Sequence, residues 1–273
     1  MVWWHILIIC VVSYFIGNIS FSRFLAKTKK KDITKLGSGN AGSTNVLRNF
    51  GLGMGVLNLA LDIFKGFLPS ILAYYIFGQN IIYLYIAGIC AMIGHIYPVI
   101  YKFKGGKGIA SMLGVFLAAD WWVTLIVIGV ALVCWLIFKY GSLSSFVCVT
   151  ALTVVEGLRA KSAFNAGIID AWQLKILSML LFAIFCLTWY AHRSNIERLL
   201  CGRESKVSLI KSTKLKLKLE KLAEQRALKK MRQQKIVQQT EVAVASEQTK
   251  SDNQADLIKK DESENKKNNS EEK

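Results

Sequence analysis

Residues 121–138 read WWVTLIVIGVALVCWLIF, eighteen residues without a single charge. A helix needs about 20 mostly apolar residues to cross the ~30 Å hydrocarbon core of a bilayer, so this stretch predicts a membrane helix. Comparable apolar segments lie at 3–25, 54–77, 81–101, 108–119, 142–157 and 171–191. The sequence therefore predicts an all-α, polytopic integral membrane protein with about seven membrane helices, of which 108–119 and 142–157 are short.

Composition changes sharply near residue 205. The chain is 53% hydrophobic and yet carries a formal net charge of +17. Residues 1–205 hold the apolar segments and are expected to form the membrane domain. Residues 206–240 are basic with scattered leucines, which predicts a juxtamembrane helix attracted to anionic lipid. Residues 241–273 are rich in Lys, Glu, Asn and Ser, a composition that cannot bury a core and predicts disorder. We expect a monomer.

Basic residues follow the first, third and seventh apolar segments, as the ranges 27–35, 102–107 and 193–203 show. Short basic loops face the cytoplasm. This pattern predicts an outside N-terminus and a cytoplasmic C-terminus in the cell membrane. The polar stretches at 37–48, 104–108 and 192–204 then share the cytoplasmic face, which suggests one composite site.

The first of these stretches is GSGNAGSTNVLR at residues 37–48. Glycines permit unusual backbone dihedrals, the small polar side chains offer hydrogen bonds, and Arg48 carries a planar guanidinium suited to phosphate. A flexible linker is the alternative interpretation. The dense polar side chains favour a site that holds a small anion, with candidates Ser38, Asn40, Thr44, Asn45 and Arg48.

The second stretch is Lys104-Gly105-Gly106-Lys107-Gly108, immediately before an apolar segment. A glycine-rich turn into a helix N-terminus favours phosphate, and Lys107 adds a point charge. A basic membrane anchor with a tight turn is the alternative. The stretch is not a Walker A loop, because Gly108 stands where Ser or Thr is required.

The third stretch follows the last apolar segment. His192, Asn195 and Arg198 are three residues apart, so they share one face if the helix continues. A histidine at a membrane boundary is otherwise an interfacial residue. The six cysteines are scattered without a C-x-x-C pair, so we expect neither a metal site nor a cofactor.

Polar residues also occur within or beside the apolar segments. Asp62 and Lys65, three apart, are expected to form a local ion pair that supports the site. His95 is either an interhelical histidine or part of the site. Ser142 and Ser145 begin the sixth segment, where they can cap the helix or donate hydrogen bonds into the pocket.

With these residues identified, the chain resembles the PlsY-type, acyl-phosphate-dependent glycerol-3-phosphate acyltransferases. The resemblance covers residues 1–205 and rests on residues 37–48, on Phe103 to Gly108, and on a third motif. That third motif comprises His192, Asn195, Arg198, Gly202 and Glu204. The resemblance implies seven membrane helices and a cytoplasmic active site. It assigns activity mainly to Ser38, Arg48 and His192, glycerol 3-phosphate to Gly105–Gly108, and a structural role to Glu204.

The reaction implied is attack of the 1-hydroxyl of glycerol 3-phosphate on a fatty acyl phosphate, giving lysophosphatidate and phosphate. Either His192 or the phosphate of the substrate can accept the hydroxyl proton. The alternative function is a membrane transporter for an anionic phosphorylated metabolite, since intramembrane charges and glycine-broken helices also suit transporters. The absence of a duplicated half and the grouping of polar motifs on one face favour the enzyme.

Overall fold

The structure is a computed structural model that describes residues 3–204, together with residues 206, 222, 224, 225, 228 and 231–234. The chain divides into two units, Met1–Lys214 and Leu215–Lys273, and every element discussed below belongs to the first. The predicted basic helix at 206–240 and the predicted disordered segment at 241–273 lie almost entirely outside the described residues.

Every regular element between residues 3 and 204 is helical. The helices are α1 (Trp3–Asn18), α2 (Phe21–Thr28), α3 (Ser43–Phe50), α4 (Leu52–Ile76), α5 (Ile81–Ile96), α6 (Ile109–Ala119), α7 (Trp121–Phe138), α8 (Gly141–Asn165), α9 (Ala171–Ala191) and α10 (Arg193–Leu200). Two short 3-10 turns, η1 (Ile33–Lys35) and η2 (Val99–Tyr101), complete the order. The all-α prediction is confirmed.

Six helical stretches in the described part of the chain are long and apolar enough to cross a membrane. They are Trp3–Thr28, Leu52–Ile76, Ile81–Tyr101, Trp121–Phe138, Gly141–Asn165 and Ala171–Ala191. The eleven-residue α6 is the short seventh helix that the sequence predicts. A polytopic membrane protein is therefore the correct architecture.

One expectation about these segments was wrong. The segment expected at 142–157 is the 25-residue helix α8, which continues past Glu156 and Arg159. Glu156 accepts a hydrogen bond from the Tyr85 hydroxyl at 3.2 Å, and Arg159 forms an ion pair with Asp120, so these charges do not end the helix. The first apolar segment corresponds to the span Trp3–Thr28, within which the helix is interrupted between α1 and α2. The Ile19 carbonyl then accepts from Lys65 Nζ at 2.7 Å.

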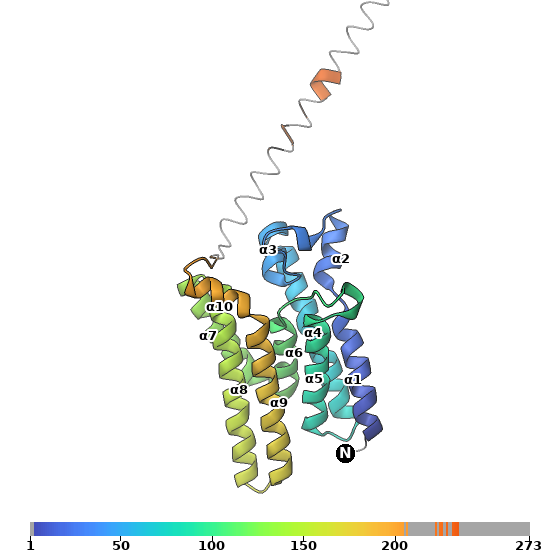
Figure 1. Ribbon diagram of the computed structural model, residues 1–273, viewed down its shortest axis with the longest axis vertical. Helices are drawn as coiled ribbons and strands as arrows, with labels where there is room; N and C mark the ends of the chain where they lie inside the picture. The colour runs from blue at the N-terminus through green and yellow to red at the C-terminus, as the bar shows by residue number, and fades with distance from the viewer. Residues whose placement is uncertain are drawn as a thin grey trace, which may run out of the picture. The chain divides into compact units, whose positions relative to one another are not determined.

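The helices form a bundle with two distinct ends (Figure 1). The start of α1, the α4–α5 turn and the α8–α9 turn lie at one end, whereas α3, the loop before α6 and α10 lie at the other. The polar stretches that the charge pattern placed on one face therefore do gather at one end. The apolar core lies where α5, α6, α8 and α9 meet. Its largest fully buried side chains include Tyr85, Met92, Met112, Phe116, Leu152 and Ile184.

Glycines allow backbones to touch at two helix crossings. A Cβ added to Gly17 of α1 would lie 2.1 Å from the Ala91 carbonyl oxygen of α5, and one added to Gly66 of α4 would lie 2.0 Å from that of Ser111 in α6. Small residues at such contacts are the usual means of packing helices closely in a membrane. The helices that carry the site are thus held at fixed separations.

Candidate active site

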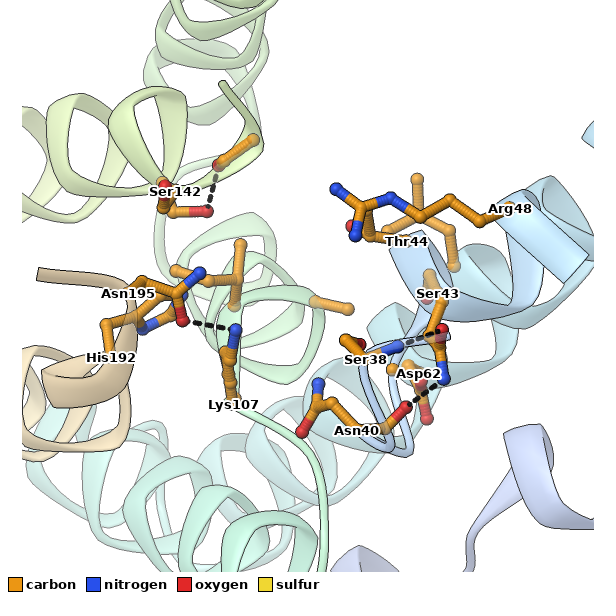
Figure 2. Close-up of a pocket in the computed structure, with 18 of the residues that line it drawn as sticks. Ser38, Asn40, Ser43, Thr44, Arg48, Asp62, Lys107, Ser142, His192 and Asn195 are labelled. Atoms are coloured by element: carbon orange, nitrogen blue, oxygen red, sulfur yellow. Dashed lines mark hydrogen bonds between the residues drawn. The ribbon is translucent and has the colours of Figure 1, made fainter. Parts of the chain in front are cut away.

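A cavity of about 320 Å³ is lined by residues of α3, α10 and the segments around them (Figure 2). This volume is within the range of small-molecule sites. Its lining comes from the loop and helix around α3, from α4 and α5, from the start of α6, from the start of α8, and from α10 with its flanks. The lining residues are Ser38, Asn40, Gly42, Ser43, Thr44, Asn45, Arg48, Leu59, Asp62, His95, Lys107, Gly108, Ile109, Ala110, Gly141, Ser142, Ser145, His192, Asn195, Arg198 and Glu204.

Asn45 organises the loop that precedes α3. Its Oδ1 accepts from the Ser38 amide at 3.1 Å, and its Nδ2 lies 2.9 Å from the Leu36 carbonyl and 3.0 Å from that of Asn40. Gly37 has a φ of +55°, and a Cβ there would lie 2.4 Å from Asn45 Oδ1, so only glycine fits beside this amide. The loop is therefore a bonded turn and the flexible-linker interpretation is wrong. It fixes Ser38 and Asn40 at the cavity.

Arg48 extends from α3 toward the cavity, opposite Asn195 and His192 (Figure 2). Burial is the main cause that lowers the pKa of its guanidinium, and nearby Arg198 adds to this while Glu204 opposes it. Arginine titrates so far above neutrality that it remains charged. The cavity thus has a permanent cation on its α3 side.

Lys107 stands at the entrance to α6, on a loop that pairs with the end of α5. The Gly105 amide donates to the Ile96 carbonyl at 3.2 Å and the Gly106 amide to that of His95 at 3.0 Å. Gly108, with φ +86°, is the N-cap of α6, so the glycine-rich stretch leads into a helix N-terminus as the sequence predicts. Lys107 Nζ donates to Asn195 Oδ1 (Figure 2). Burial, reinforced by Arg198 and Arg48, lowers the pKa of Lys107 to about 8.

His192 is buried where α9 ends and α10 begins. Its Nδ1 lies 2.9 Å from the Thr188 carbonyl oxygen. Because a carbonyl only accepts, Nδ1 carries the proton and Nε2 is left as an acceptor. Burial lowers the pKa of His192 to about 4, with Lys107 adding to the shift. The imidazole is therefore neutral at pH 7.

Glu204 connects three side chains of the cavity wall. Its Oε1 accepts from Ser142 Oγ at 3.0 Å and from Asn195 Nδ2 at 2.7 Å, and its Oε2 accepts from Arg198 Nε at 2.8 Å. Burial opposes ionisation, but the hydrogen bonds from Arg198, Asn195 and Ser142 outweigh it, so the pKa of Glu204 lies below its usual value. The carboxylate thus ties α8 to α10.

A buried polar chain supports the cavity from α4. Asp62 forms the expected ion pair with Lys65 at 2.9 Å, and its Oδ2 accepts from Asn58 Nδ2 at 2.8 Å. Asn58 Nδ2 also reaches Ser43 Oγ at 2.8 Å, and His95 Nδ1 lies 3.8 Å from Asp62 Oδ1. This chain fixes α4 to the start of α3 and to the end of α5.

Most of the predicted site residues line the cavity, including Asp62, His95, Arg198 and Glu204. Four predicted residues do not line it, namely Lys65, Lys104, Gly105 and Gly106. Lys65 is turned toward the Ile19 carbonyl, and Gly105 and Gly106 pack under the end of α5. The Lys104 carbonyl accepts from Arg23 at 2.7 Å. These positions shape the loop that presents Lys107.

The serines at the start of α8 do not cap it. Ser145 Oγ bonds back to the Gly141 carbonyl at 2.8 Å and Ser142 turns to Glu204, so the helix has no side-chain cap bond. The sequence did not single out six lining residues: Gly42, Ser43, Leu59, Ile109, Ala110 and Gly141. Asn58 was also missed, although an amide one turn before Asp62 in an apolar segment is a recognisable signal.

The charges in the cavity suit an anion. Arg48, Lys107 and Arg198 are cationic, while both carboxylates, Asp62 and Glu204, already accept hydrogen bonds from protein groups. The N-terminus of α6 adds amide donors beside Lys107. Within the described residues, no group of three or more His, Cys, Asp or Glu side chains is placed to hold a metal ion.

Comparisons with known proteins give a consistent result. Residues 7–202 match the family model described as glycerol-3-phosphate acyltransferase. The chain is 37% identical over 214 residues to the glycerol-3-phosphate acyltransferase of Mycoplasmopsis pulmonis, covering 75% of this chain and 94% of the relative. It is 42% identical over 199 residues to that of Thermosipho melanesiensis, covering 73% and 91%.

Solved structures agree with the sequence comparisons. The crystal structure of PlsY (YgiH), an integral membrane glycerol 3-phosphate acyltransferase, in its glycerol 3-phosphate form matches with a TM-score of 0.66 and 36% identity, covering 76% of this chain and 97% of that one. Its lysphosphatidic acid form matches with a TM-score of 0.65, also at 36% identity, covering 76% and 98%. The chain therefore belongs to the glycerol-3-phosphate acyltransferase family and is an integral membrane acyltransferase.

Proposed function

We propose that the protein transfers a fatty acyl group from acyl phosphate to the 1-hydroxyl of glycerol 3-phosphate. The products are lysophosphatidate and phosphate, and the reaction begins bacterial phospholipid synthesis. The observation that carries the proposal is the meeting of Arg48, Lys107 and the acceptor Nε2 of His192 in one cavity. The solved relatives are described in a glycerol 3-phosphate form and a lysphosphatidic acid form, which fit the substrate and the product.

The acyl phosphate donor needs no covalent enzyme intermediate. It is a mixed anhydride with a good leaving group, so the hydroxyl oxygen attacks the carbonyl directly, the carbonyl–phosphate bond breaks, and phosphate departs. The protein must hold two phosphates together, offset their repulsion and align hydroxyl with carbonyl. We assign the phosphates to Arg48, Lys107 and the amides at the start of α6. Ser38, Asn40, Thr44 and Asn45 complete the α3 side.

His192 and Asn195 face this arrangement from α10. We propose that His192 Nε2 orients glycerol 3-phosphate by accepting a hydrogen bond from its other hydroxyl, while the proton of the attacking 1-hydroxyl passes to a substrate phosphate oxygen. Asn195 holds Lys107. Ser142 and Ser145 border the pocket, Gly105, Gly106 and Gly108 shape the loop, and Asp62, Lys65, His95, Arg198 and Glu204 brace the walls. The acyl chain would lie among the apolar helices.

The donor is tested with purified protein, glycerol 3-phosphate and either acyl phosphate or acyl-CoA, while lysophosphatidate is measured by mass spectrometry. We expect product from acyl phosphate alone, without added metal or nucleotide. Turnover that required acyl-CoA would overturn the donor assignment.

We also propose that the active site faces the cytoplasm, with the N-terminus outside and the C-terminus inside. The support is the basic character of residues 27–35, 102–107 and 193–203, which flank the end of the bundle that holds the cavity. A C-terminal fusion to a reporter that is active only in the cytoplasm tests this orientation. An inactive reporter on a stably produced fusion would reverse the assignment.

The stretch 206–240 is proposed to bind anionic lipid headgroups next to the membrane, and the enzyme is proposed to act as a monomer. Residues 206–235 contain 11 Lys or Arg and 2 Glu, a charge suited to an anionic surface. A transporter has no specific support, because the polar groups gather at one end of the bundle.

A further inference from the structure

The side-chain amide of Asn195 has only one orientation available to it. Its Nδ2 donates to Glu204 Oε1 at 2.7 Å, and its Oδ1 accepts from Lys107 Nζ. A carboxylate can only accept and an ammonium can only donate, so reversing the amide would break both hydrogen bonds. Asn195 is buried, so breaking both hydrogen bonds would be costly. The position of Lys107 is thus coupled to Glu204 through one rigid amide.

Glu204 is itself firmly held. Arg198 Nε donates to its Oε2 at 2.8 Å and Ser142 Oγ to its Oε1 at 3.0 Å, and only 7% of its side chain is exposed. A continuous chain of hydrogen bonds therefore runs from α8 through Glu204 and Asn195 to the loop before α6. These elements are far apart in sequence, since Lys107 and Asn195 are 88 positions apart.

Most of the surroundings of Lys107 favour its neutral amine over the ammonium form. Cationic Arg48 of α3 and Arg198 of α10 line the same cavity, burial disfavours the ammonium form, and His192 is neutral with a pKa of about 4. The remaining titratable groups of the lining are His95 of α5, Asp62 of α4, which is paired with Lys65, and Glu204. Glu204 is the group that raises the pKa of Lys107, which nevertheless lies at about 8.

We propose that Glu204 is a positioning residue for Lys107: it aims the lysine through the Asn195 amide, and its charge keeps the ammonium protonated to receive a substrate phosphate. The inference rests on the proposed function in assigning Lys107 to a substrate phosphate. It gives Glu204 a role in the reaction beyond bracing α8 against α10.

The test uses Glu204→Gln, which keeps an acceptor oxygen for Asn195 but removes the charge. Glu204 is the opposite charge that raises the pKa of Lys107, so without it the basic limb of the pH profile of kcat/KM for glycerol 3-phosphate should move to lower pH. Arg198→Gln, which removes a cation, should move it higher. Glu197→Gln is the matched control, because Glu197 is an exposed residue of α10 outside the cavity, and its profile should match wild type.

A second readout is independent of activity. Trace acetic anhydride labelling across pH, quantified by mass spectrometry, titrates Lys107 directly, and its midpoint should move with the kinetic limb. An unshifted Lys107 midpoint in folded Glu204→Gln would overturn the inference. If that variant does not purify, Glu204→Asp is used instead, because it moves the carboxylate away by one methylene. The pKa of Lys107 should then fall by less than in Glu204→Gln. An unchanged pKa would overturn the inference equally. Failure of wild-type protein to make lysophosphatidate would refute the proposed function, whereas the labelling would still decide this inference.

Discussion

Replacing Gly106 with alanine places a methyl group against the buried ring of His95. The added Cβ would lie 2.1 Å from His95 Nε2 and 2.7 Å from Cε1. Ordinary van der Waals contact begins at about 3.4 Å, so the two groups must separate by 3.4 − 2.1 = 1.3 Å. His95 is only 7% exposed and faces Asp62, which limits its movement. The loop that carries Lys107 should therefore move instead.

A displacement of about 1 Å at a reacting centre can cost on the order of 10²-fold in rate. We therefore expect Gly106→Ala to lower kcat/KM for glycerol 3-phosphate by about 100-fold while the protein still inserts and purifies. The assay is initial-rate formation of lysophosphatidate from acyl phosphate. Gly129→Ala in α7 is the matched control, since nothing lies within 4 Å of a Cβ there, and its rate should be unchanged.

The contact with His95 can be tested directly by a second substitution. If the ring is what displaces the loop, His95→Ala should be less harmful in the Gly106→Ala background than in wild type, a coupling that a double-mutant cycle measures. A Gly106→Ala enzyme within a few-fold of wild-type kcat/KM would refute the reasoning, because it would show that the loop tolerates the methyl group without moving Lys107.

Four further predictions concern the same site and the tail. Arg48→Lys keeps the charge but loses the two-pronged donor, so turnover should fall by on the order of 10²-fold in folded protein; near-normal rates would remove Arg48 from the site. His192→Gln should retain partial activity and His192→Ala much less; equal, near-total losses with glycerol 3-phosphate binding intact would instead indicate a base. With pKa values of about 4 for His192 and about 8 for Lys107, the neutral imidazole is lost only as pH falls through 4 and the ammonium as pH rises through 8. A pH–rate profile should therefore decline near pH 8, and persistence of full kcat/KM at pH 9.5 would contradict the role of Lys107. Deleting residues 210–273 should leave turnover in detergent intact but weaken retention on anionic vesicles, and a folded but inactive truncation would contradict a peripheral tail.

The apolar runs and the basic loops were enough to predict the bundle, because burial in lipid imposes a simple length rule. The end of one membrane segment was predicted wrongly. The sixth segment was expected to end at 157, yet α8 continues past Glu156 and Arg159, for which Tyr85 and Asp120 provide partners. Those partners come from α5 and the α6–α7 junction, and no local pattern in the sequence indicates them.

The candidate site was partly predictable for a related reason. Residues that share a motif, such as Ser38 and Arg48, were found together because their chemistry is concentrated in one short stretch. The link from Glu204 through Asn195 to Lys107 joins separate motifs, so it depends on tertiary packing. Asn45 lines the cavity, and its amide also bonds the loop to itself, a contact that the sequence alone does not indicate.

The contact between Gly17 and Ala91 has a consequence for how the protein is made. The two residues are 91 − 17 = 74 positions apart, and chains are synthesised at about 5–20 residues per second. For roughly 4–15 s after α1 has been synthesised, α5 is therefore not yet present. During this interval Asn18, which is buried in the complete fold, lacks the packing around it. The charged pair in α4 leaves the ribosome earlier and can enter the bilayer already neutralised, since Asp62 and Lys65 lie on one helix. The amino-terminal half can therefore complete its packing only after α5 has been synthesised.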